Sequence, residues 1–255
     1  MNFIMDLHTH SVACGHAYST FFENVCAAYE KGLAVYGFSE HAPALLKGTE
    51  PAFFANLKIL PGEYKGMRIL KGCEVNIIDL EGHFDLNEKL LGSLDYVIAS
   101  LHIDCLKPGT AKENTDCLIR VMDHSFVRII AHPDDSQFPL EYERLVAAAK
   151  EKKVLLEVNE SSLKPTSSRK GGREHVLTYL ELCKCHRVPV ILNTDAHYAP
   201  LIGDFTNGRR VLEEVDFPEE LVVNTSVEML RRYLPVVSAA LHLFLFLLPV
   251  IQIKI

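Results

Sequence analysis

Seven short apolar runs recur along the first two hundred residues, and longer stretches with helical spacing separate them. The runs cover residues 3–7, 34–38, 67–73, 96–101, 127–131, 154–158 and 188–192, and each is rich in Val, Ile and Leu. Runs of this length without polar alternation are typical of strands that are buried on both faces. We therefore predict seven parallel strands, since parallel neighbours need long crossover connections.

The stretches between the runs predict the crossover helices. Thr20 and Glu23 have the spacing of a capping box at the start of the first helix, and Gly32 follows its last turn. Further helices are expected over residues 112–122, 140–152 and 173–186, and residues 43–65 predict a loop with a short helix over one end. Seven such units favour an α/β barrel over an open sheet.

Length and charge narrow the class of protein. The 255 residues fit one α/β barrel, and 48% hydrophobic with 23% charged residues is an ordinary globular mixture. Lys plus Arg number 26 against 33 Asp plus Glu, for a net charge of −7. An acidic surface argues against a general nucleic-acid binder, so we expect a small-molecule partner and no nucleic acid. The seven cysteines form no C-x-x-C pair, which predicts reduced thiols and a cytoplasmic protein.

Histidines and acids gather at the ends of the predicted strands. His8 and His10 lie two residues apart after the first strand, so both side chains point to the same side. The same end of the other strands, with one residue before the first helix, supplies His16, His41, Glu74, His102, His132, Asp195 and His197. Because functional residues of a parallel barrel lie at the carboxyl ends of its strands, these nine side chains predict one metal pocket.

The ligand set predicts several cations. Seven imidazoles and two carboxylates can bind three metals, each with about three protein ligands and an open position for water. Imidazole-rich sites suit zinc, iron or manganese, and softness alone does not choose among them.

The motifs D-L-H-T-H, H-A-Y-S-T, S-E-H, G-x-E-x-N, L-H, A-H-P and T-D-A-H stand here in one order. With these motifs in this order, the chain resembles the PHP (polymerase and histidinol phosphatase) family over residues 2 to about 234. It is most similar to the small stand-alone bacterial phosphatases of the YcdX type within that family. The resemblance implies a distorted seven-stranded (βα)7 barrel over residues 1–234 with a trinuclear, zinc-containing site. It implies His8, His10, Glu74 and Asp195 as ligands of the first metal, Glu74, His102 and His132 of the second, and His16, His41 and His197 of the third.

The expected reaction is hydrolysis of phosphomonoesters by a hydroxide that bridges two metals, with His10, Glu74 and Asp195 as the catalytic residues. Arg169 and Lys170 precede a predicted helix and are expected to bind the phosphate of the substrate. Glu160 follows the sixth strand, where an uncharged residue would suit a phosphate better.

Four alternatives stay open. An amidohydrolase-type enzyme also opens with H-x-H, but that class often needs a lysine at the end of the fourth strand, where His102 stands. A nuclease would use the same metal chemistry, and a histidinol-phosphate phosphatase is a narrower option within the family. The fourth alternative is a non-catalytic barrel that the metals only stabilise.

The last residues differ from the rest of the chain. Residues 235–253 are apolar except for Ser238, His242 and Gln252, and they follow Arg231 and Arg232. The segment has just the length of a membrane span, and arginines before it would keep the barrel on the cytoplasmic face. Membrane anchoring, packing in a dimer and an extension unrelated to the fold are the three interpretations of residues 235–255.

Overall fold

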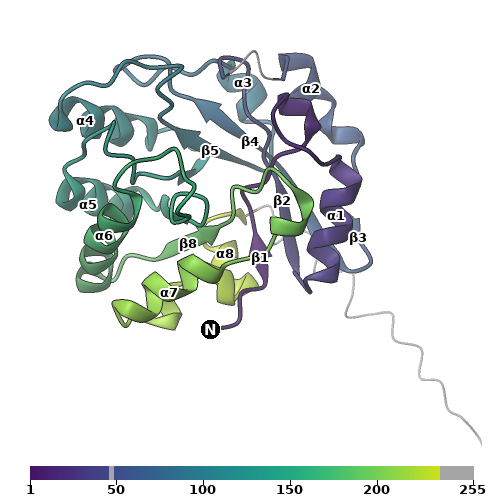
Figure 1. The fold of residues 1–255 in the computed structure, drawn as a ribbon. Coiled ribbons are helices and arrows are strands. Elements are labelled where there is room, and N and C mark those ends of the chain that lie inside the picture. The colour runs from purple at the N-terminus through teal and green to yellow at the C-terminus, as the bar shows by residue number, and fades with distance from the viewer. Residues whose placement is uncertain (46–48, 236–255) are drawn as a thin grey trace, which may run out of the picture.

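The computed structural model describes residues 1–45 and 49–235, and a nearly closed barrel of parallel strands forms its centre (Figure 1). The strands pair in the order β1-β2-β4-β5-β6-β7-β8. Their bounds are Met5–Asp6 (β1), Val35–Phe38 (β2), Met67–Asn76 (β4), Tyr96–Ser100 (β5), Val127–Ile130 (β6), Leu155–Asn159 (β7) and Val190–Asn193 (β8). All seven predicted strands are confirmed, as is the barrel.

Two details of the sheet differ from the prediction. β4 extends to Asn76, so Glu74 lies inside the strand rather than after it. The two-residue strand β3 (Glu63–Tyr64) pairs antiparallel with the start of β4 and was not predicted. Two residues are too few to give a hydrophobic period, so pattern reasoning has no signal for β3.

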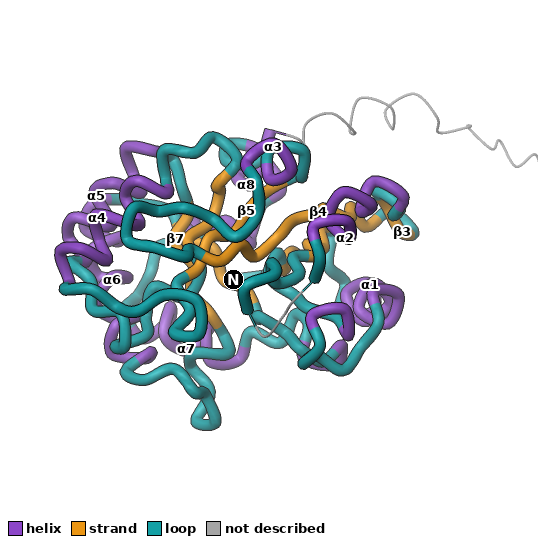
Figure 2. Tube along the Cα trace, turned by 90° about the horizontal axis from the view of Figure 1, so that it is seen from above, coloured by secondary structure: helices purple, strands orange, loops and turns teal. Residues whose placement is uncertain are grey.

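The helices cover the outside of the barrel. They are α1 (Phe21–Glu30), α2 (Pro51–Asn56), α3 (Glu88–Leu91), α4 (Ala111–Val121), α5 (Tyr142–Lys152), α6 (Gly172–His186), α7 (Thr206–Glu214) and α8 (Val227–Arg231). Figure 2 shows α4, α5 and α6 along one side, with α1, α2 and β3 on the opposite side. The predicted capping box of α1 is confirmed, because Thr20 and Glu23 bond each other's backbone N–H.

Hydrogen bonds from side chains and from the segments after the strands join β1 and β8, the two ends of the strand order. Oδ1 of Asp6 accepts a hydrogen bond from the backbone N of Thr194 at 3.1 Å, and the backbone N of His10 donates to the carbonyl of Ala196 at 2.9 Å. The side-chain amide of Asn224 also forms hydrogen bonds with the backbone of both β1 and β8. The acid of the D-L-H-T-H motif therefore closes the barrel beside the two histidines.

Apolar side chains fill the barrel interior at its amino-terminal end. Met5, Tyr96 and Ile98 are among the buried residues there, and α8 adds Leu230. The packing is tight, because a Cβ at Gly72 would lie 2.5 Å from Cζ of Tyr96. A pocket within the barrel can therefore open only at the carboxyl ends of the strands.

The predicted apolar tail lies outside the described residues from residue 236 onward. Within residues 1–45 and 49–235, no helix has both the length and the apolar character that a membrane crossing needs. The domain boundary at residue 234, the cytoplasmic location and the three interpretations of the tail stay predictions.

Candidate metal centre

The structure brings all nine predicted metal ligands to the carboxyl end of the barrel. His8 and His10 follow β1, His41 follows β2, Glu74 lies in β4, His102 follows β5, His132 follows β6, and Asp195 and His197 follow β8. His16 comes from the loop after the short 3-10 helix η1 (Val12–Cys14). Elements far apart in the sequence thus contribute to one cluster.

Glu74 occupies the middle of this cluster. Its carboxylate is fully buried and faces five imidazoles. The distances are 2.6 Å to Nδ1 of His41, and 3.0, 3.2, 3.3 and 3.4 Å to Nε2 of His132, His8, His102 and His10. One carboxylate among so many imidazoles is the arrangement that a bridging ligand requires.

Asp195 joins the cluster from the loop that follows β8. Its Oδ1 lies 3.2 Å from Nε2 of His10 and 3.6 Å from Nε2 of His8. Asp195 and His132 both have positive φ, 53° and 29°. Such backbone conformations are unfavourable for residues with a side chain, and they concentrate at functional sites. A backbone hydrogen bond from His132 N to Oε2 of Glu157, at 2.9 Å, helps to hold one of them.

Neighbouring acceptors fix which ring nitrogen of four histidines carries the proton. Nδ1 of His8 lies 2.8 Å from Oε1 of Glu157, and Nδ1 of His102 lies 2.7 Å from Oδ1 of Asn76. Backbone carbonyls take the same role for Nδ1 of His16 and of His197. Because a neutral imidazole has one donor and one acceptor, these contacts make Nε2 the acceptor of each ring, as metal ligation requires. Nε2 of His16 and Nε2 of His197 face each other at 2.8 Å.

The buried polar atoms of the cluster test whether cations fit it. The atoms without a hydrogen-bond partner among the described residues include Nε2 of His8, both ring nitrogens of His10 and of His41, Oε2 of Glu74 and Oδ1 of Asp195. Leaving so many polar atoms unpaired in the interior is costly, and a bound cation would satisfy their lone pairs together. Burial also lowers the pKa of His132 and of His197 to about 4, which keeps both rings in the neutral form that binds metals.

Among the nine predicted ligands, three sets of three residues have the geometry of a cation site. In each set the ligand atoms lie within 4.8 Å of one another. The sets are His8, His10 and Glu74; His41, Glu74 and His102; and His16, His41 and His197. The residues present therefore fit a cluster of divalent cations.

A cavity of about 640 Å³ opens above the cluster. His16, His102 and His197 form part of its floor, and Ser161, Lys164 and Arg169 are among its polar walls. The ligand nitrogens are therefore accessible to a small molecule from one side only.

Comparisons with known proteins agree with this geometry. A family model described as PHP domain matches residues 6–161, which is more than half of the chain. This chain belongs to the PHP domain family.

Curated relatives extend the match over nearly the whole chain. A probable phosphatase of Clostridium novyi is 43% identical over 234 residues, which covers 92% of this chain and 95% of that protein. A probable phosphatase of Acetivibrio thermocellus is 41% identical, with 92% and 96% covered. Histidinol phosphate phosphatase from Lactococcus lactis, solved with zinc, L-histidinol and phosphate, has a TM-score of 0.58 at 17% identity, covering 84% of this chain and 94% of that one. That last likeness shows the fold alone.

The two basic residues expected to bind substrate lie in different places beside the PHP centre. Nη2 of Arg169 lies 2.9 Å from Oδ2 of Asp195, and its Nη1 donates to Asn159 at 3.2 Å. Arg169 also lines the cavity. Lys170 is exposed and does not line the cavity, whereas Lys164 does. The structure thus brings Arg169, but not Lys170, to the centre.

Glu160 has a structural role instead of facing the phosphate. Its carboxylate accepts hydrogen bonds from the backbone N of Asn207 at 3.0 Å and of Gly208 at 2.7 Å, in the first turn of α7. The free N–H groups at the start of α7 thus hold this carboxylate, and Glu160 does not line the cavity.

Three residues around the centre escaped the sequence analysis. Glu157 and Asn76 orient His8 and His102, and the buried Glu40 lies 3.8 Å from Nδ1 of His10. Glu157 carried a usable signal, since it is the one acid within the apolar run 154–158. Asn76 and Glu40 stood inside recognised motifs, but spacing alone does not separate a ligand from the residue that orients it.

Proposed function

We propose that this chain is a metal-dependent phosphatase that hydrolyses small phosphomonoesters at a centre of three divalent cations, with zinc as the first expectation and manganese or iron as alternatives. The observation that carries the proposal is the buried carboxylate of Glu74, surrounded by five imidazoles. Three of these rings, those of His8, His10 and His41, have ring nitrogens without a hydrogen-bond partner among the described residues. The probable phosphatases among its relatives support the reaction class.

The nine side chains divide among three cations as the family resemblance implies. His8, His10, Glu74 and Asp195 would hold the first, Glu74, His102 and His132 the second, and His16, His41 and His197 the third. Bound divalent cations lower the pKa of water to near 7 and neutralise charge on phosphoryl oxygens. Glu74 and Asp195 balance only part of the cationic charge, so the centre favours a phosphate dianion over a neutral or cationic group.

The protein residues orient this centre and its substrate. Glu157 and Asn76 keep two ligand rings in the tautomer that offers Nε2. Arg169 holds Asp195 with one side of its guanidinium and borders the cavity, where it can donate to a phosphate oxygen. Apolar side chains pack the barrel below the centre, and the cavity opens above it.

The cavity and the charge of the protein favour a small substrate. A space of about 640 Å³ accommodates a phosphorylated metabolite. The net charge of −7 disfavours a long nucleic acid, which would need a basic surface around the site. These two properties favour a phosphatase over a nuclease.

The test removes and restores the metal. The full-length protein is stripped with a chelator, reloaded with zinc, manganese or iron, and assayed with an aryl phosphomonoester, an aryl phosphodiester, histidinol phosphate and a labelled oligonucleotide. We expect monoester hydrolysis that disappears on stripping and returns with metal. Faster cleavage of the diester or oligonucleotide would support the nuclease, and bound metal without turnover of any substrate would support the non-catalytic barrel.

A further inference from the structure

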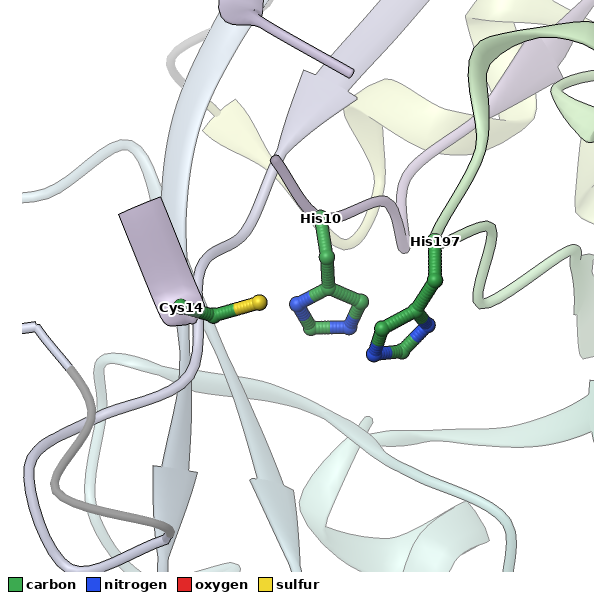
Figure 3. Close-up of side chains that lie close together, drawn as sticks. All are labelled: His10, Cys14 and His197. Atoms are coloured by element: carbon green, nitrogen blue, oxygen red, sulfur yellow. The ribbon is translucent and has the colours of Figure 1, made fainter. Parts of the chain in front are cut away.

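A buried thiol lies against the metal centre without belonging to it. Cys14 ends η1, the turn that connects His10 to His16. Its side chain is 2% exposed, and the sulfur points toward the His10 ring, with His197 beyond (Figure 3). Sγ of Cys14 and one nitrogen each of His10 and His197 lie within 4.8 Å of one another.

Two buried groups beside the thiol are unpaired. His10 is fully buried, and neither of its ring nitrogens has a hydrogen-bond partner among the described residues. Oε2 of Glu40, also buried, has no partner there either and lies 3.8 Å from Nδ1 of His10. The thiol of Cys14 and the free oxygen of Glu40 thus both lie beside the His10 ring, whose nitrogens have no other hydrogen-bond partner among the described residues.

We propose that Cys14, His10 and His197 form a second binding site, which overlaps the centre, for a soft divalent cation such as Cd²⁺, with Glu40 as a nearby oxygen donor. The donor set explains the preference, because thiolate and imidazole favour soft and borderline cations over Mg²⁺ or Mn²⁺. The cation can enter through the cavity, whose wall includes His197.

Binding at this site exchanges a proton for a cation. Without the cation, Sγ of Cys14 donates its proton to the backbone carbonyl of Ser11 at 3.1 Å. Binding breaks the S–H bond, forms a sulfur–metal bond and releases the proton to solvent, with no change of oxidation state. A hard cation gains little from the sulfur and leaves the thiol protonated.

The site competes with the centre because they share ligands. When Cd²⁺ binds, His10 would no longer hold the first cation of the proposed centre, and His197 would no longer hold the third. The competition therefore rests on the proposed function. One Cd²⁺ ion would therefore release zinc from the centre. The Cd–S bond itself does not depend on phosphatase activity.

The experiment measures metal binding rather than turnover. The zinc-loaded full-length protein, in a background where the partly exposed Cys26, Cys105 and Cys185 are serine, is titrated with Cd²⁺. We expect an ultraviolet sulfur-to-cadmium charge-transfer band that saturates at a single Cd²⁺ per chain, with zinc release detected by an indicator dye. Cys14→Ser should abolish the band and reduce the zinc release.

Cys117→Ser is the matched control, since Cys117 is also buried and its thiol lies 3.5 Å from a backbone carbonyl, that of Asp79. This variant should keep the band. A band that survives Cys14→Ser would overturn the proposal. Should Cys14→Ser fail to fold, X-ray absorption at the cadmium edge of the background protein decides: one sulfur with nitrogen ligands supports the site, and a shell without sulfur contradicts it. Neither readout requires turnover, so failure of the phosphatase proposal is recognised separately.

Discussion

The candidate centre has an inner and an outer part that use the same imidazole chemistry on different supports. The inner group is His8, His10, Glu74, His102, His132 and Asp195, and the outer group is His16, His41 and His197. Inner ligands lie in a strand or within four residues of its end, and the side-chain acceptors Glu157 and Asn76 hold two of them, His8 and His102. His16 and His197 lie on loops, where Nδ1 of each meets a backbone carbonyl and the two Nε2 atoms lie 2.8 Å apart, and the His197 side chain is 28% exposed.

This difference indicates how the two parts bind cations. The inner group contains both carboxylates, and burial strengthens their attraction for a cation. The outer group has imidazoles only, and all three of them line the cavity. We therefore expect tight, slowly exchanging cations in the inner group and a weaker, faster-exchanging cation in the outer group.

The largest effect is expected from Glu74→Gln. The amide keeps the size of the side chain but removes the negative charge that five imidazoles share. Mutation of a residue that only orients a metal ligand costs about 10–100-fold in metal affinity. Loss of the ligand Glu74 itself should therefore lower phosphatase activity by more than about 100-fold. Metal analysis should show the inner cations lost. Glu143→Gln, an exposed change on α5, is the control, and equal metal content in both variants would argue against a bridging Glu74.

A more selective loss is expected from His197→Ala. It removes one of three ligands from the outer group and leaves the inner carboxylates in place. The protein should bind one cation fewer after dialysis, while the remaining cations resist the same chelator treatment. Simultaneous loss of all bound metal would show that the inner and outer parts do not act separately.

An intermediate effect is expected from Glu157→Gln. Oε1 of Glu157 accepts from His8, and Oε2 accepts from the backbone N of His132 and from Asn159. An amide would place an N–H against one of these donors, which misorients a ligand without removing it. Metal affinity of the inner group should fall by about 10–100-fold, and excess metal should restore most of the rate. A lost rate that excess metal fails to restore would point to a role beyond orientation.

The smallest effect is expected from Arg169→Lys. A lysine cannot keep the fork that contacts Asp195, Asn159 and Ser162 together, so phosphate contact weakens while the metals stay. We expect KM to rise by about 10-fold, equivalent to about 1.4 kcal/mol. Lys170→Ala, at an exposed position away from the cavity, should leave KM within about twofold. Equal effects of the two variants would contradict the placement of Arg169.

The sequence allowed the inner and outer ligands to be predicted because a parallel barrel collects its strand ends. His8, Glu74 and Asp195 could be assigned to one pocket without any knowledge of distances. The surrounding contacts could not be predicted, since they depend on side-chain direction after folding. Glu160 illustrates this limit, because its position after β7 indicated the cavity while its carboxylate binds the start of α7.

The residues that orient the ligands were predictable only in part. Glu157 is an acid in a buried strand, which already requires a polar partner. Cys14 gave no comparable signal, because a buried cysteine usually serves as a small apolar residue. Its proximity to His10 and His197 follows from the turn at η1, which joins ligands of the inner and outer groups.

The most direct test of the metal centre is an anomalous difference map from crystals of the zinc-loaded full-length protein, collected on both sides of the zinc edge. The account predicts peaks among the nine side chains, two around Glu74 and one bounded by His16, His41 and His197. A protein that hydrolyses phosphomonoesters while its map shows no peak at Glu74 would contradict the account.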